Sequence, residues 1–138
     1  MLEIKRLSPV IGAEVSGANL ISPNDDEFKE LEQALSEYSV LFFRDQPRLS
    51  PKQQVAFATQ FGPLHSHPAA PVLEDDEAIF VIKTDANSKV ANGNGWHTDV
   101  SCDNEPPLVT MLQLHQLPET GGDTLFSSMY AAYETLSP

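Results

Sequence analysis

The pattern of apolar and polar positions predicts several short strands. Residues 2–21 alternate in part, with interruptions at Pro9, Gly12 and Gly17, which indicates two short strands. Residues 40–43 (Val-Leu-Phe-Phe) form a continuous β-prone apolar run and predict a buried strand. Extended segments are also predicted at residues 78–84, 95–101 and 108–115.

Three helices are predicted among these strands. The first has Ser22 as its N-cap, a proline at the first helical position, and an apolar face that runs to about Tyr38. The second begins after Ser50, and Gln53 completes a capping box with it. A short third helix is predicted from residue 127 or 128. Short strands with a few peripheral helices favour an antiparallel sandwich or jelly roll.

The composition sets limits on partners and compartment. The 138 residues suit one compact domain, and the 11 prolines indicate many loops. With 20 acidic against 8 basic residues, the formal net charge of −12 makes nucleic acid and anionic membrane surfaces unsuitable partners. No apolar run is long enough to span a bilayer, and the N-terminus lacks the plan of a secretory signal. Cys102 is the only cysteine, so a reducing cytoplasm is expected.

The candidate chemistry centres on residues 95–101, Gly-Trp-His-Thr-Asp-Val-Ser. Because side chains alternate along an extended segment, His97 and Asp99 are expected to project to the same side. An imidazole and a carboxylate are two of the three ligands in a 2-His-1-carboxylate facial triad, which holds a non-haem Fe(II). Taken alone, the His-x-Asp pattern arises often by chance, and it also fits a surface histidine beside a loop aspartate.

A proline-rich loop over residues 64–71 carries two further histidines, His65 and His67. A His-x-His pair suits zinc, and with His97 it could form a zinc hydrolase site. That alternative lacks a catalytic acid at a recognised spacing. Histidines beside prolines in loops more often face solvent or bond to the backbone.

Four blocks of sequence, in this order, resemble the taurine dioxygenase (TauD/TfdA) family. They are Val40-Leu41-Phe42-Phe43-Arg44, Phe61-Gly62-Pro63-Leu64-His65, Trp96-His97-Thr98-Asp99 and Gly121-Gly122-Asp123-Thr124-Leu125. The resemblance runs over essentially the whole chain. It implies an Fe(II)- and 2-oxoglutarate-dependent dioxygenase on a double-stranded β-helix. The expected fold is therefore mainly β with peripheral helices, as a partial jelly roll.

The resemblance also implies roles for individual residues. His97 and Asp99 would be iron ligands, and Thr124 would hydrogen-bond the carboxylate of 2-oxoglutarate. His67 would contact the sulfonate of the substrate. Without the resemblance, Thr124 would be an ordinary turn residue.

Two positions depart from the taurine-specific pattern. Taurine-specific members carry a tyrosine in place of Ala70 and an asparagine in place of Gly93. Losing a hydroxyphenyl group and an amide would enlarge the pocket and remove polar partners. A bulkier or more apolar sulfonate or sulfate ester therefore fits at least as well as taurine.

The implied activity is hydroxylation of a small organosulfonate (taurine-like) or an alkyl sulfate next to the sulfur group, with release of sulfite or sulfate. O2 and a small anionic substrate are the expected partners, and a homo-oligomer is compatible with the family. The family's catalytic domain is about twice as long, and its C-terminal half carries the distal histidine ligand and the arginine that pairs with 2-oxoglutarate. Residues 1–138 are thus expected to be the N-terminal portion of one such domain, inactive alone. The alternative is a truncated, non-catalytic domain with at most weak metal binding.

Overall fold

The computed structural model describes residues 2–66, 79–85, 87–89, 93 and 95–137. The chain divides into two compact units, and each is described by itself. The first unit comprises residues 1–48 and 114–138, and the second comprises residues 49–113. The elements are β1 (Glu3–Arg6), β2 (Ala13–Ser16), α1 (Asp25–Tyr38), β3 (Leu41–Phe42), α2 (Pro51–Ala58), the 3₁₀ helix η1 (Thr59–Phe61) and α3 (Met129–Glu134).

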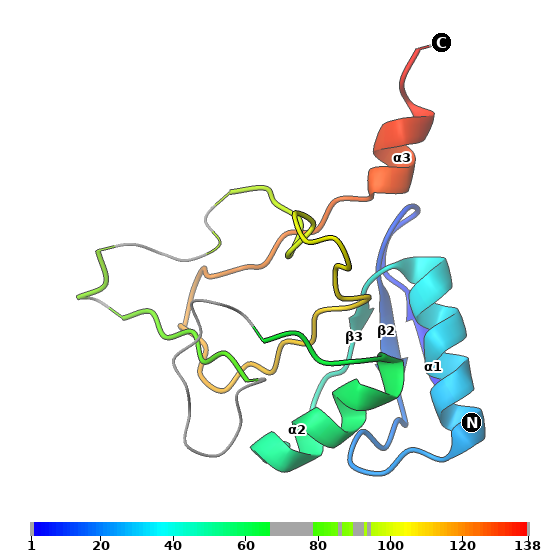
Figure 1. Ribbon diagram of the computed structural model, residues 1–138, viewed down its shortest axis with the longest axis vertical. Coiled ribbons are helices and arrows are strands. Elements are labelled where there is room, and N and C mark those ends of the chain that lie inside the picture. The colour runs from blue at the N-terminus through cyan, green and yellow to red at the C-terminus, as the bar shows by residue number, and fades with distance from the viewer. Residues whose placement is uncertain (1, 67–78, 86, 90–92, 94, 138) are drawn as a thin grey trace. The chain divides into compact units, whose positions relative to one another are not determined.

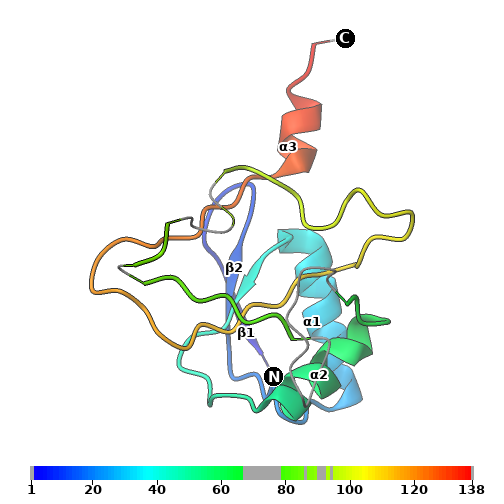
Figure 2. The ribbon, with the colours of Figure 1, turned by 60° about the vertical axis from the view of Figure 1, so that its left-hand side comes forward.

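A three-stranded sheet in the order β1-β2-β3 forms the centre of the first unit. β1 and β2 pair antiparallel, with Ile4 opposite Val15, as the partial alternation predicts. β3 pairs parallel to β2, with Ala13 opposite Leu41. A parallel neighbour needs a crossover connection, and α1 supplies it between β2 and β3. Figures 1 and 2 show α1 running alongside this sheet.

The helix α1 begins two residues later than predicted and ends where predicted. Its N-cap is Asn24, not Ser22, and the Asn24 side chain accepts a hydrogen bond from the backbone N–H of Glu27. The preceding residues form a separate turn, in which Asn19 Oδ1 accepts from the N–H of Ser22. The helix ends at Tyr38, followed by a C-cap residue with a positive φ of 63°. Ser22 therefore belongs to the turn before the helix, because Asn24 caps it.

The buried apolar side chains lie mostly in the first unit. Six of them are Leu2, Ala13, Val15, Leu20, Leu31 and Ala34. Val15 on β2 and Leu31 on α1 are each only 1% exposed, so helix and sheet share one apolar layer. Phe42 of β3 also makes an edge-to-face contact with Phe126, with ring centroids 5.8 Å apart. This contact holds the segment that leads into α3.

In the second unit, α2 follows the predicted capping box. Ser50 accepts from the backbone N–H of Gln53, and the Gln53 side chain accepts from the N–H of Ser50 at 2.9 Å. Phe57 is buried at 5% exposure and meets Phe61 edge to face. The segment then turns at Gly62, as the glycine-proline sequence predicts.

Three predicted extended segments are not strands. Residues 79–84, the described part of the segment 78–84, are irregular, as are residues 107–115. Residues 96–98 are irregular and residues 99–102 form a turn. A strand exists only through hydrogen bonds to a neighbouring strand, so β-prone sequence alone does not produce one. The described residues thus form a small sheet with helices, and the predicted predominance of β structure is not seen in them. Within this part of the chain, no helix has the length and apolar character needed to span a membrane.

Candidate metal centre

The local backbone orients the His97 ring. His97 Nδ1 lies 2.8 Å from the carbonyl oxygen of Gly95. Because a carbonyl oxygen only accepts hydrogen bonds, Nδ1 carries the proton in this contact, which leaves Nε2 as the nitrogen that can bind a metal ion. Gly95 makes this geometry accessible because its φ is +139°, a value that favours glycine. This is the arrangement found in metal-binding histidines, in which the second nitrogen donates to a carbonyl or carboxylate.

The two predicted ligands converge. His97 Nε2 lies 3.2 Å from Asp99 Oδ1, and their side chains are 55% and 46% exposed. Two ligands about 2.1 Å from one octahedral ion, at right angles, stand about 3.0 Å apart. The observed separation therefore suits a shared divalent ion. An imidazole nitrogen and a carboxylate oxygen, without a thiolate, also fit the donor set of non-haem Fe(II).

A turn, not a strand, brings the two groups together. The prediction of an extended segment over residues 95–101 is wrong. The side chains of His97 and Asp99 nevertheless lie close together, as that prediction expected. The turn at residues 99–102 is closed by the N–H of Asp103, which donates to the carbonyl of Val100 at 3.1 Å. Val100 has a φ of +50°, which is unusual for a β-branched residue. The chain reverses directly after Asp99.

Gly93 lies beside the His97 ring. A Cβ atom built on Gly93 would meet His97 Cε1 at 3.6 Å, which is ordinary van der Waals contact. The φ of Gly93 is +79°, where asparagine is more easily accommodated than most residues with a side chain. A side chain at position 93 would therefore begin in contact with the ring of the candidate ligand.

The described residues do not complete a three-ligand site. In the ranges 2–66, 79–85, 87–89, 93 and 95–137, no group of three or more His, Cys, Asp or Glu side chains is placed to hold a metal ion. The zinc alternative gains no support, because His65 Nε2 lies 2.9 Å from Asp103 Oδ2 and is engaged there. His67, the other member of that alternative, lies outside the described residues, as does Ala70.

The predicted roles of Thr124 and His67 stay predictions. Thr124 belongs to the first unit and is exposed, after Gly121 and Gly122, which both have a φ of +74°. The proposed sulfonate contact of His67 is among the residues not described. His115, in the first unit, accepts a hydrogen bond from Arg48 through Nδ1 at 2.9 Å, in line with a structural role.

Sequence reasoning missed two contacts near the candidate ligands in the sequence. One is the backbone carbonyl of Gly95, which could have been suspected from a glycine two residues before a candidate ligand histidine. The other is the contact of His65 with Asp103, which are 38 residues apart. No periodicity or spacing rule connects residues so distant in the sequence.

The chain is similar to dioxygenases and a sulfatase of known sequence. An alkylsulfatase of Acinetobacter baylyi is 38% identical over 98% of this chain and 42% of its own length. An alpha-ketoglutarate-dependent sulfate ester dioxygenase of Pseudomonas putida is 33% identical over 98% of this chain and 44% of its own length. An alpha-ketoglutarate-dependent sulfonate dioxygenase of Saccharomyces cerevisiae is 29% identical. The chain spans less than half the length of these relatives.

Two solved structures are also similar to this chain. A crystal structure from Burkholderia xenovorans, described as a "Putative Alpha-ketoglutarate-dependent Taurine Dioxygenase", matches 99% of this chain and 48% of its own length. The TM-score is 0.79 and the sequence identity is 34%. A second structure, a taurine dioxygenase of the same organism, covers 76% of this chain with a TM-score of 0.63.

The family comparison covers nearly every residue. The model of the family described as "Taurine catabolism dioxygenase TauD, TfdA family" matches residues 3–138. This match confirms the resemblance indicated by the four sequence blocks. The chain belongs to the TauD/TfdA family.

Proposed function

We propose that this chain supplies two ligands, His97 and Asp99, of an Fe(II)- and 2-oxoglutarate-dependent dioxygenase. The proposed substrate is a small organosulfonate or an alkyl sulfate, hydroxylated next to the sulfur group with release of sulfite or sulfate. The observation that carries the proposal is the 3.2 Å separation of His97 Nε2 from Asp99 Oδ1. Because the chain belongs to a dioxygenase family, a metal-binding role explains the proximity of these two side chains better than a chance surface contact does.

The chain's own groups perform three tasks in this proposal. The carbonyl of Gly95 keeps the proton on Nδ1 of His97, so Nε2 is available as a ligand. Asp99 contributes an anionic oxygen, which neutralises part of the charge of a divalent ion. When bound, Fe(II) would supply the redox chemistry by which 2-oxoglutarate and O2 oxidise the substrate. Thr124 is proposed to bind the carboxylate of 2-oxoglutarate, and His67 the substrate's anionic group.

Substrate size is proposed to depend on Gly93. A side chain there would contact the His97 ring, and glycine provides no such side chain. The named substrates of two relatives, a sulfate ester and a sulfonate, support an organosulfur anion as the class. We propose a substrate bulkier or more apolar than taurine.

A complete site is proposed to need polypeptide beyond these residues. The relatives are more than twice as long as the matched chain, and a third ligand and a cationic anchor for 2-oxoglutarate would lie in that additional sequence.

The burial pattern supports the corresponding jelly-roll fold. Pro107, Val109, Met111 and Gln113 are partly buried, whereas the residues between them are exposed. Such alternation is typical of a strand, and we propose that residues 107–114 become one when a neighbouring strand is present.

Metal binding tests the ligand assignment. Titration of the chain with Fe(II) under anaerobic conditions, or with Co(II) as a spectroscopic probe, should give one site. His97→Ala or Asp99→Ala should weaken binding at least about 100-fold, because either change removes a ligand. His115→Ala and Asp85→Ala are matched controls that should leave the affinity unchanged. Equal binding by His97→Ala and the unaltered chain would contradict the proposal.

Turnover separates the proposed dioxygenase from a non-catalytic domain. Succinate formation that depends on an alkyl sulfate or alkyl sulfonate, with Fe(II) and 2-oxoglutarate supplied, is the readout. This chain alone should show none, whereas a chain extended to the length of its relatives should show it. Failure of the extended chain across both substrate classes would favour the non-catalytic alternative. Turnover by these residues alone would contradict the proposed need for a third ligand.

A further inference from the structure

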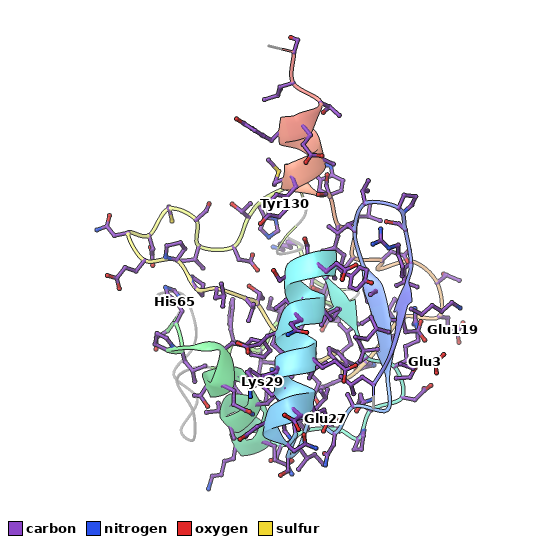
Figure 3. The ribbon with its side chains drawn as sticks, turned by 90° about the vertical axis from the view of Figure 1, so that its right-hand side faces the viewer. Glu3, Glu27, Lys29, His65, Glu119 and Tyr130 are labelled. Carbon is purple, nitrogen blue, oxygen red and sulfur yellow. The ribbon has the colours of Figure 1, made fainter. Side chains whose placement is uncertain are left out.

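A histidine–aspartate contact joins the candidate metal loop to the segment that follows η1 in the second unit. His65 Nε2 lies 2.9 Å from Asp103 Oδ2, with side-chain exposures of 23% and 45%. Figure 3 shows the His65 side chain just beyond the end of the helical segment formed by α2 and η1. Both residues belong to the second unit, as do His97 and Asp99. The sequence resemblance assigns neither His65 nor Asp103 a role in the site.

Asp103 makes one contact through its backbone and another through its carboxylate. Its backbone N–H donates to the carbonyl of Val100 and closes the turn that follows Asp99. Its carboxylate is held by His65 through Oδ2, and Cys102 Sγ lies 3.9 Å from the other oxygen. Asp103 therefore connects the turn to His65, which lies 38 residues earlier in the sequence.

The turn needs such a connection because it is strained. Val100 is β-branched and has a φ of +50°, a conformation that costs about 1–2 kcal/mol for an L-residue. Strained backbone persists only where surrounding contacts outweigh the cost. The hydrogen bond from Thr98 Oγ1 to Ser101 Oγ, 2.6 Å long, spans the same turn but lies wholly within it. Among the hydrogen bonds that residues 98–103 make within the described part of the chain, only the one between Asp103 and His65 reaches a segment distant in the sequence.

We propose that His65 and Asp103 are positioning residues for the metal ligands. By holding Asp103, His65 keeps the 99–102 turn in the form that directs the carboxylate of Asp99 toward Nε2 of His97. The inference rests on the proposed function, in which His97 and Asp99 bind the metal. It gives His65 a role that is distinct from that of a zinc ligand.

The expected size of the effect follows from similar groups elsewhere. Removal of a partner that orients a metal ligand typically weakens metal binding about 10–100-fold. His65→Leu should therefore weaken Co(II) binding by about that factor and alter the visible spectrum of bound Co(II). His65→Gln should retain most of the affinity, because a carboxamide N–H can still donate to Asp103.

A double-mutant cycle isolates the pair. Asp103→Leu should weaken Co(II) binding about as much as His65→Leu, and the double variant should lose little more than either single change. Arg44→Gln, which removes an ion pair with Glu14 in the first unit, should leave Co(II) affinity unchanged. Far-UV circular dichroism of each variant confirms that the helices remain folded, and Asp103→Asn serves as a milder substitution.

The outcomes distinguish this inference from the proposed function. If His97→Ala abolishes Co(II) binding while His65→Leu and Asp103→Leu leave it unchanged, the positioning role is wrong and the ligand assignment stands. Additive losses in the double variant would likewise overturn the pairing. If His97→Ala leaves binding unchanged, or the unaltered chain binds no Co(II), the ligand assignment and the inference both fail.

Discussion

The two units of this chain differ in what holds them together. In the first, six described apolar side chains are buried, among them Val15 on the three-stranded sheet and Leu31 on α1. Among the described residues of the second, only Leu49 and Phe57 are buried apolar side chains. The long-range contacts among the described residues of this unit include polar ones, namely the pair of His65 with Asp103 and the bonds of Gln113 to residue 49. The scaffold is built by apolar burial, and the candidate metal centre lies where polar contacts position the chain.

This difference has a physical consequence for the candidate centre. Apolar burial is non-directional and tolerates small shifts, whereas a hydrogen bond fixes distance and angle. Metal ligands need defined positions, so a region organised by directional bonds suits them. The same region should open more readily, because only two of its described apolar side chains are buried.

Removal of a buried side chain from the first unit should have the largest effect. Leu31→Ala is expected to lower the free energy of unfolding by about 2–5 kcal/mol, because Leu31 is 1% exposed and leaves a cavity. Leu108→Ala in the second unit is the matched control, and at 78% exposure it should change stability by less than about 0.5 kcal/mol. Denaturant unfolding followed by circular dichroism measures both. Equal effects would mean that the apolar layer of the first unit is not the main source of stability.

Gln113 tests whether polar contacts organise the second unit. Its side chain accepts from the N–H of Leu49 at 2.7 Å and donates to the carbonyl of Leu49 at 3.1 Å, so it pairs like a peptide group. Gln113→Ala should destabilise the chain by about 1–3 kcal/mol, because it leaves partly buried backbone groups without this partner. Amide hydrogen exchange should accelerate around α2 and not in α1. Gln33→Ala, an exposed change on α1, provides the control, and acceleration confined to α1 in Gln113→Ala would refute the assignment.

The helix caps should give the smallest and most similar effects. Asn24→Ala and Ser50→Ala each remove a side-chain acceptor at a helix N-terminus and should each cost about 1 kcal/mol. Hydrogen exchange should localise the two effects to α1 and α2 respectively. Ser22→Ala should have little effect, since Ser22 is not the cap. A larger loss from Ser22→Ala than from Asn24→Ala would restore the original sequence-based boundary.

The candidate ligands were proposed from the sequence, whereas the contacts around them were not. His97 and Asp99 were chosen because they stand two residues apart and belong to a sequence block that resembles a family, and their metal binding stays a prediction. The turn that joins them was not predicted, since positive φ at a valine has no sequence signal. His65 was considered only as a metal ligand, although its structural partner is Asp103.

The sequence by itself determined the elements that depend on contacts three or four residues apart. These include α2 with its Ser50–Gln53 capping box and the end of α1. Partial alternation also predicted the short strands β1 and β2, which pair across a short connection. Tertiary structure alone decided the parallel pairing of β3, the contact of Gln113 with Leu49 and that of His65 with Asp103. Local hydrogen bonds and helical periodicity are written into neighbouring residues, so a pattern reveals them. Strand pairing and side-chain contacts across 38 or 64 residues depend on where the folded chain brings distant groups, which no local pattern records.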